Sequence, residues 1–310
     1  MDKLTKLLQS GLTLVMAVCL AGLAGCETNP YTGRSQLLMT SVPEEMQMGA
    51  QAYSQVKNDP KMHQSQDPRE IEPVRRVAAR IVEAAKRSKY AEMANEFQWE
   101  VTVFKDDKTA NAFALPGGKM AVYTGIFPMA KTEAGLAAVM GHEVVHALAR
   151  HGAERMSQGQ LTNVGLQIVG AAAGGSGMLG QATMAALGVG AQVGVLLPFS
   201  RKHESEADYV GILLAADAGY DPRESIALWE RMGQTSGGGA PSEFMSTHPS
   251  HETRIAQLKK WMPEAMAIYQ TQLPGACGAV AACSVGRSIR GEPLKVGISS
   301  PIVFWREGED

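Results

Sequence analysis

The spacing of hydrophobic residues predicts a protein built mainly from helices. Apolar side chains recur at helical spacing from about Arg69 to Lys89 and from about Thr132 to His151, which is typical of helices that pack one face against a core. A later amphipathic helix is indicated from about Phe199 to Gly219. Pro43 followed by two acids has the chemistry of a helix N-terminus, and we expect this helix to end near Val56.

Two short segments predict strands. Trp99, Val101 and Val103 alternate with polar residues, which is the pattern of a strand with one buried face. The glycine-rich run 111–118 is expected to turn into a second strand, Lys119–Thr124, whose small and aromatic apolar residues suit a sheet edge beside a cleft. We therefore predict an α+β fold, mainly helical, with a small sheet whose edge strand lines the cleft.

The first residues have the order of a secretion signal. Lys3 and Lys6 form a basic start, and the apolar stretch Gly11–Ala24 that follows is too short for a typical transmembrane helix. Leu23-Ala24-Gly25-Cys26 looks like the lipobox of bacterial lipoproteins, which implies removal of residues 1–25 and lipid attachment to Cys26. The alternative is an ordinary signal peptide with an incidental cysteine.

The segment after this cysteine is expected to be a tether. Residues 26–43 are polar and rich in turn-forming residues, so they are expected to lead from a membrane to the folded domain. Glu27 stands where an aspartate would hint at retention in the inner membrane of enteric bacteria. The sequence therefore favours the periplasmic face of the outer membrane.

An uncharged stretch follows the predicted helix at 132–151. Between Met156 and Ser200 there is no Asp, Glu, Lys or Arg, and a glycine-rich run near residue 175 interrupts the stretch. We interpret residues 157–198 as an apolar helical hairpin packed in protein, because asparagine and glutamine occur in both arms. Contact with a membrane, or formation of a homo-oligomer, is the alternative.

Composition limits the classes of function. The chain has 310 residues, of which 45% are hydrophobic and 19% charged, as expected for a globular protein with a real core. Its formal net charge of -2 gives no reason to expect nucleic acid as a partner. Cys277 and Cys283 lie close together near the C-terminus, and an oxidising periplasm would permit a local disulfide between them.

The strongest chemical signal is the motif His142-Glu143-Val144-Val145-His146. On a helix, His142 and His146 lie on one face, so both imidazoles can reach one tetrahedral zinc ion. Glu143 lies beside them, where it can act as a base on a water molecule. Gly141 is unfavourable inside a helix, and close packing against another backbone would explain it. We expect one Zn²⁺ per chain on a buried helix.

A catalytic zinc site needs a third protein ligand. In the later amphipathic helix, Glu204 and Asp208 share one face, while Glu206 points elsewhere. We predict that Glu204 binds zinc and that Asp208 accepts a hydrogen bond from Nδ1 of a ligand histidine. His151 is out of register for a ligand, and we interpret it as a cation at a helix C-terminus with Gly152 as the cap.

A further segment, Thr247-His248-Pro249, reads as a rigid turn before a helix. His248 could reach the open side of the site as an extra ligand or as a donor to the developing oxyanion, and we assign it a catalytic role. A plain surface turn is the alternative. Arg254, in the following helix, is expected to pair with an acid rather than to take part in chemistry.

These motifs resemble those of a known family. H-E-x-x-H, then E-x-x-A-D on a later helix, then T-H-P before an arginine is similar to the pattern of the zinc metallopeptidases related to the CAAX prenyl endoproteases and the mitochondrial Oma-type protease. The segments Asn29–Arg34 and Leu115–Gly118 also resemble the bacterial lipoprotein branch. The resemblance implies a gluzincin-type peptidase domain over residues 44–262, and we assign no role to the tail 263–310.

The resemblance also implies the roles of individual residues. It makes His142, His146 and Glu204 the zinc ligands and Glu143 the catalytic base. It places Asp208 behind a ligand histidine, where it orients the imidazole ring.

The expected function is zinc-dependent endopeptidase activity, anchored by lipid in the bacterial envelope and directed at misfolded or misassembled periplasmic and outer-membrane proteins. The substrate is expected to lie extended along Lys119–Thr124 by strand addition. One alternative is a latent protease in which His248 plugs the site until a partner displaces it. Another is a metal-bound chaperone or assembly factor that works with the outer-membrane assembly machinery.

Overall fold

The computed structural model describes residues 26–172, 199–235, 243–248 and 252–273. The predicted signal peptide, the second arm of the apolar hairpin, and the part of the tail from residue 274 onward lie outside these residues. The cysteine pair Cys277 and Cys283 belongs to that part of the tail. Within them the fold is α+β, mostly helical with small sheets, as the sequence predicts.

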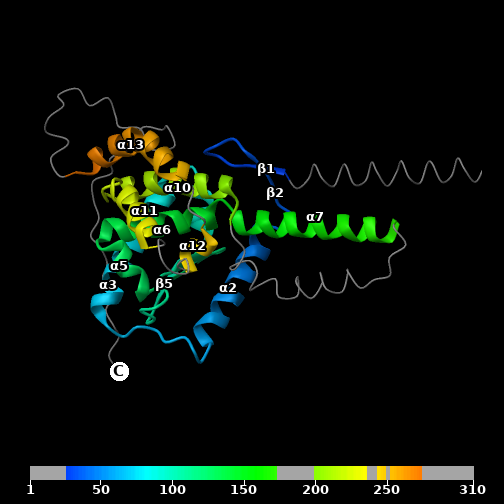
Figure 1. Cartoon of the computed structure of the whole chain (residues 1–310), viewed down its shortest axis with the longest axis horizontal. Helices are drawn as coiled ribbons and strands as arrows, with labels where there is room; N and C mark the ends of the chain where they lie inside the picture. Colours follow the sequence, from blue (N-terminus) through cyan, green and yellow to red (C-terminus); the bar gives the residue numbers. More distant parts are fainter. Residues whose placement is uncertain (1–25, 173–198, 236–242, 249–251, 274–310) are drawn as a thin grey trace, which may run out of the picture.

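The elements follow one another along the chain as shown in Figure 1. They are β1 (Cys26–Thr28), β2 (Ser35–Leu37), α2 (Val42–Asn58), α3 (Pro68–Arg87), α4 (Ala91–Glu96), β3 (Glu100–Phe104), β4 (Ala112–Leu115), β5 (Lys119–Tyr123), a 3-10 turn (Thr124–Ile126), α5 (Phe127–Ala130), α6 (Glu133–Leu148), α7 (His151–Ala172), α10 (Arg201–Asp217), α11 (Glu224–Thr235), α12 (Glu243–Thr247) and α13 (Glu252–Gln272).

The larger sheet has the strand order β3-β5-β4, with β5 parallel to β3 and antiparallel to β4. The prediction that Lys119–Thr124 forms the sheet edge is therefore wrong, because β5 is the central strand. The two edge strands are β3 and β4, and β4 lies in the run 111–118 that the sequence suggested was a turn. Its four residues pair with β5 from Ala112 opposite Val122 to Leu115 opposite Lys119.

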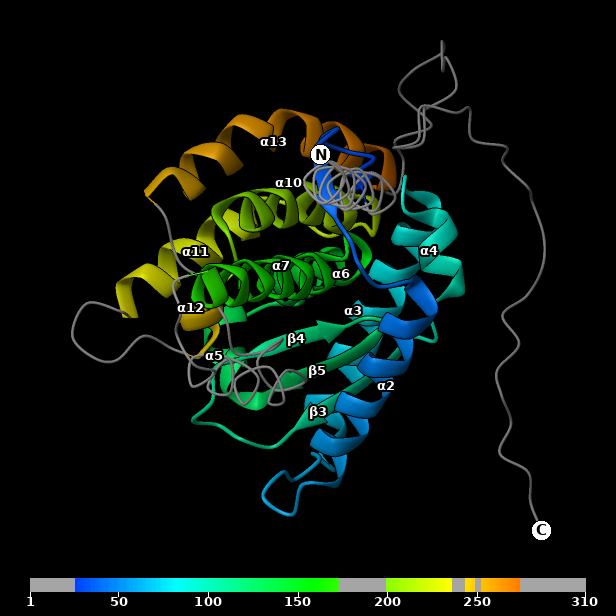
Figure 2. The same ribbon diagram turned by 90° about the vertical axis from the view of Figure 1, so that its right-hand side faces the viewer.

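Helices cover both faces of this sheet, and α2 crosses the face toward the viewer in Figure 2. Val103 and its β5 partner Val122 belong to the core with α3 and α6. Thr102 points to the opposite face, where its hydroxyl hydrogen-bonds the Tyr53 hydroxyl of α2 at 2.6 Å. The period of two along a strand explains this division, since successive side chains point to opposite faces.

The buried helix α6 packs closely against α10 at two glycines. A Cβ added to Gly141 would lie 2.9 Å from the carbonyl oxygen of Gly211, and one added to Gly211 would lie 3.0 Å from the backbone nitrogen of His142. The close approach explains why glycine stands before the first histidine of the motif, as expected. Helix α13 then covers the outer side of α10 (Figure 2).

Helix α6 ends earlier than predicted. Its last residue is Leu148, and Arg150 adopts a left-handed backbone with φ 56° before α7 begins at His151. Buried Arg150 forms ion pairs with Glu45 of α2 at 2.6 Å and with Glu27 of β1 at 2.6 Å, so the break in the helix is tied to the N-terminal elements.

Helix α7 projects from the body (Figure 1). None of the helices described is long and apolar enough to cross a membrane.

Part of the predicted tether is folded onto the body. Strands β1 and β2 form an antiparallel hairpin, and the side chain of Asn29 accepts hydrogen bonds from the backbone of Tyr31 and Thr32 in its turn. Gln36 of β2 is buried and donates to the carbonyl oxygen of Ala149 at 2.8 Å. Residues 28–38 are thus anchored against the break between α6 and α7.

Candidate active site

Four potential metal-ligating side chains meet at the centre of the fold. His142 and His146 lie one turn apart on α6, Glu204 lies in the first turn of α10, and His248 directly follows α12. One ligand atom from each residue can be chosen so that all lie within 4.8 Å of one another, and all four residues are buried. The structure thus brings together the three predicted zinc ligands and the histidine of the T-H-P motif.

The ligand atoms of the three predicted zinc ligands lie close together. Nε2 of His142 lies 3.0 Å from Nε2 of His146, and the Glu204 carboxylate lies 3.5 and 3.4 Å from these two nitrogens. Oε2 of Glu204 is buried and forms an ion pair with Nη1 of Arg254 at 2.8 Å. Two imidazoles and one carboxylate at such separations are the donor set of a catalytic zinc site.

The orientation of His142 is set by an acid and an arginine behind it. Nδ1–H of His142 donates to Oδ1 of Asp208 at 3.0 Å, which leaves Nε2 facing the cluster. Arg254 holds both carboxylate oxygens of Asp208, through Nη2 at 2.8 Å and Nε at 2.5 Å, and stacks over the ring of Trp229. Asp208 is therefore where the sequence predicts it, and Arg254 pairs with an acid as expected.

The side chains of the cluster differ in their protonation states. Burial lowers the pKa of His142, but hydrogen bonds to Asp208 and Glu204 outweigh it and raise that pKa to about 9. Burial holds the pKa of His146 well below its ordinary value, so this imidazole is neutral. Burial alone would raise the pKa of Glu204, but hydrogen bonds from the surrounding histidines have the larger effect and hold it well below its ordinary value. The carboxylate is therefore ionised. A neutral imidazole and an ionised carboxylate are the forms that bind zinc, so His146 and Glu204 are ready to bind it, whereas His142 would release a proton on binding.

Glu143 lies beside the cluster with a free carboxylate oxygen. Its side chain is buried, and Oε1 makes no hydrogen bond among the described residues, although Nε2 of His248 lies 3.4 Å away. Burial raises the pKa of this carboxyl group. A base whose pKa is raised toward neutrality is better matched to proton transfer near pH 7.

His151 is not the cation at a helix C-terminus that the sequence suggested. It is fully buried in the first turn of α7, and Gly152 is a residue of that helix rather than a cap. Nδ1 of His151 lies 3.0 Å from Nδ1 of His146, and Nε2 lies 3.0 Å from Glu206. Burial lowers the pKa of His151 to about 4, so the ring is neutral. The prediction failed because it assumed one continuous helix to residue 151.

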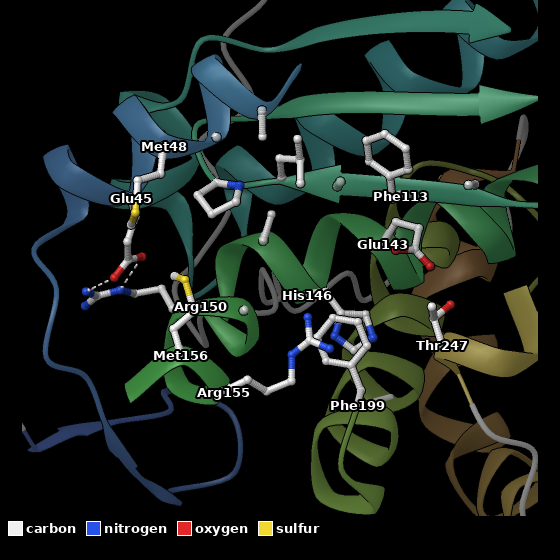
Figure 3. A pocket seen from close by; sticks show the side chains of 18 of the residues that line it. Glu45, Met48, Phe113, Glu143, His146, Arg150, Arg155, Met156, Phe199 and Thr247 are labelled. Atoms are coloured by element: carbon white, nitrogen blue, oxygen red, sulfur yellow. Dashed lines mark hydrogen bonds and ion pairs between the residues drawn. The ribbon is translucent and has the colours of Figure 1, made fainter. Parts of the chain in front are cut away.

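A mostly apolar cleft leads to the cluster (Figure 3). One wall is helix α2, the edge strand β4 runs along the cleft, and Phe113 projects into it from that strand. Glu143 and His146 line the inner end, where the ring of Phe199 stacks on His146 with centroids 3.8 Å apart. A concave apolar site that ends at a group of convergent polar side chains is the usual form of an enzyme's binding site.

Histidines one turn apart on a buried helix, with a glutamate between them and another on a second helix beside a cleft, define a metallopeptidase. Comparison with known sequences gives the family. The chain matches the model of peptidase family M48 over residues 71–262, and it belongs to this family of zinc metallopeptidases. It is accordingly a metalloendopeptidase, as the resemblance predicted.

Curated relatives fall into two groups by name. The mitochondrial metalloendopeptidase OMA1 of Schizosaccharomyces pombe is 39% identical over 245 residues, which cover 78% of this chain and 68% of that protein. The human mitochondrial metalloendopeptidase OMA1 is 31% identical over 263 residues, covering 78% of this chain and 47% of that protein. The beta-barrel assembly-enhancing protease of Escherichia coli K12 is 30% identical over 260 residues, covering 80% and 50%. The chain thus matches about half the length of the last two proteins.

Proposed function

We propose that this chain is a zinc-dependent endopeptidase with His142, His146 and Glu204 as the zinc ligands and Glu143 as the catalytic base. The observation that carries the proposal is the convergence of the ligand atoms at the inner end of the cleft. A zinc ion at this position supplies a Lewis acid that polarises the scissile carbonyl and lowers the pKa of water.

The chain's own groups supply the proton transfers. Glu143 has a free oxygen at the inner end of the cleft, so it can accept the proton of the attacking water molecule and deliver it to the nitrogen of the leaving amine. Asp208 keeps the His142 proton on Nδ1. Glu143 and the three ligand side chains are buried, and burial strengthens the electrostatic interactions among them.

The substrate of this proposal is an extended polypeptide paired with β4. This edge strand has β5 on only one side and borders the cleft, so its other side can add a strand of substrate. Strand β5, which the sequence analysis favoured, is paired on both sides and cannot take this role. An apolar cleft beside an open strand edge suits unfolded chains, which supports misfolded or misassembled proteins as substrates.

We further propose that the enzyme works in the bacterial envelope, held to the outer membrane by lipid on Cys26. The support is the signal-like start of the chain and the likeness to the beta-barrel assembly-enhancing protease. Several relatives are named as mitochondrial, so the location rests on the N-terminal sequence rather than on similarity alone. A role as an assembly factor for outer-membrane proteins would be a second activity of the same chain.

Cleavage of an unfolded model protein by the zinc-loaded chain tests the proposed function. Replacing Glu143 with Gln keeps the shape of the side chain but removes the base, so we expect Glu143→Gln to lower the rate by roughly 100- to 10,000-fold. Its zinc content should equal that of the unaltered chain. Full activity of Glu143→Gln in a zinc-replete preparation would contradict the proposal.

A second candidate is a latent form of the same protease, favoured by the position of His248. Its Nδ1 lies 3.0 Å from Glu204 and 3.3 Å from Nε2 of His142, within the ligand cluster. In this arrangement a fourth side chain stands where a catalytic zinc site keeps a position open for water or substrate. Movement of His248 would then be required before cleavage.

A further inference from the structure

The two histidines of the zinc motif are held from behind by different partners. His142 uses the acid and arginine already described, Asp208 and Arg254. His146 instead faces a second histidine, His151, at 3.0 Å between the two Nδ1 atoms. One of these two nitrogens must carry the proton and the other must accept it, because two N–H groups cannot face each other.

The remaining partner decides which nitrogen carries that proton. Nε2 of His151 lies 3.0 Å from Oε2 of Glu206, and a carboxylate can only accept, so the neutral His151 ring carries its proton on Nε2. Nδ1 of His151 is then an acceptor and takes the Nδ1–H of His146. The Nε2 lone pair of His146 is thereby left for the metal, which is the tautomer a zinc ligand needs.

Glu206 is in turn held by the N-terminal hairpin. Arg34, in the turn between β1 and β2, donates from Nε and Nη2 to the two oxygens of Glu206, each at 2.9 Å. Thr32 of the same turn donates to Glu206 at 2.5 Å. Glu206 is only 5% exposed, so these contacts replace its solvation and fix the direction in which it accepts from His151.

The same arginine holds a second buried acid of this network. Nη1 and Nη2 of Arg34 donate to the two oxygens of Glu154 in α7, at 2.6 and 2.8 Å. Glu154 also accepts from Nε2 of His203, whose ring stacks on His151 with centroids 4.5 Å apart. Arg34 therefore fixes both the acid that bonds His151 and the acid behind its stacking partner.

We propose that Arg34, Glu206 and His151 are positioning residues for His146, so that the turn between β1 and β2 forms part of the metal centre. Behind His142, an acid and then an arginine follow the ring, namely Asp208 and Arg254. Behind His146 the same sequence of groups occurs after one additional imidazole, that of His151. This inference rests on the proposed function, because it assigns the Nε2 atom of His146 to zinc.

Zinc affinity of the full chain, measured by competition with a fluorescent chelator, tests the inference. His151→Leu removes both ring nitrogens, and we expect zinc affinity to fall about 10- to 100-fold, as is usual when a partner behind a metal ligand is lost. His151→Gln can still accept from His146 and donate to Glu206, so it should restore much of this loss. Arg34→Gln should weaken zinc binding in the same range.

If His151 and Arg34 only stabilised the fold, zinc affinity would not follow the loss and recovery expected for these variants. Arg75 forms an exposed ion pair with Glu72, so Arg75→Gln is a matched control and should leave zinc affinity unchanged. Because Arg34 acts through His151, adding Arg34→Gln to His151→Leu should cause little further loss. The absorption spectrum of the Co²⁺-loaded chain should change in His151→Leu and return toward that of the unaltered chain in His151→Gln.

Two results would overturn the inference. If folded His151→Leu binds zinc within about twofold of the unaltered chain, His151 does not position a ligand. If Arg34→Gln does not fold, the zinc affinities of His151→Leu and His151→Gln still test the inference, because both variants keep Arg34 and the acids that it contacts. An unaltered chain that binds no zinc would instead refute the proposed function together with this inference.

Discussion

At the residue scale, each motif histidine offers one nitrogen to the cluster and has the other fixed from behind. The spacing of Glu204 and Asp208 along one helix face was sufficient to predict where both lie. The contacts of His151 and Arg34 could not be predicted, because they join the N-terminal turn, α7 and α10. Local spacing relates residues within one element and carries no information on such long-range partners.

His248 provides the residue-scale prediction. Since His248 lies among the ligand atoms, His248→Ala should open a position at the metal and raise the rate of cleavage of an unfolded protein several-fold. The three other ligands remain, so the zinc content should not change.

The exposed His63 offers a control, and His63→Ala should leave cleavage unchanged. A loss of cleavage in His248→Ala at full zinc content would exclude latency and would favour a direct role in the reaction, such as donation to the oxyanion.

At the element scale, the helices that carry the site and the strands β3 and β5 were predicted well, but strand β4 and the order of the strands were not. The hydrophobic period located α3, α6 and α10 to within a few residues, because each buries one continuous face. Strand β4 has only four residues and lies between a turn and a glycine pair, so its pattern is too short to distinguish a strand from a loop. The break after Leu148 was missed because Arg150, a good helix former, adopts a left-handed backbone there.

We predict that the close contact between α6 and α10 is required for both stability and zinc binding. Gly141→Ala would place a methyl group 2.9 Å from the Gly211 carbonyl oxygen, so it should lower the free energy of unfolding by about 1–3 kcal/mol. It should also weaken zinc binding, because α6 carries the two histidines and α10 carries Glu204. Urea unfolding and chelator competition measure the two effects.

A substitution at a glycine with free space around it serves as a control, because it changes helix propensity without changing close packing. Gly233 lies in α11, and a Cβ there would meet nothing within 4 Å, so Gly233→Ala should be neutral or stabilising by up to about 1 kcal/mol. Equal effects of the two substitutions would show that the α6–α10 contact does not determine the geometry of the site.

At the scale of the whole molecule, the site is assembled from distant parts of the chain. Helix α2 forms one wall of the cleft, β4 forms the strand along it, and the hairpin of β1 and β2 contacts the base of α7. Composition and pattern could predict the α+β class and the buried motif helix. They could not predict that residues taken for a tether fold against the metal centre, because turn-rich polar sequence is common to both.

At this scale, we predict that the substrate binds in the cleft between α2 and β4. Ala52 of α2 lines the cleft, so Ala52→Trp should obstruct an extended substrate and raise KM for an unfolded protein roughly tenfold, about 1.4 kcal/mol of binding. Ser54 is exposed on the same helix and lies outside the cleft lining, so Ser54→Trp is the matched control. An equal KM for both variants would mean that the substrate does not enter between α2 and β4.

The metal centre itself is tested most directly by X-ray absorption at the zinc edge of the zinc-loaded full chain. We expect one zinc ion with nitrogen and oxygen ligands at about 2.0–2.2 Å and the outer-shell scattering of imidazole rings. A sulfur shell at about 2.3 Å, which would indicate cysteine ligands, or the absence of tightly bound zinc would contradict it.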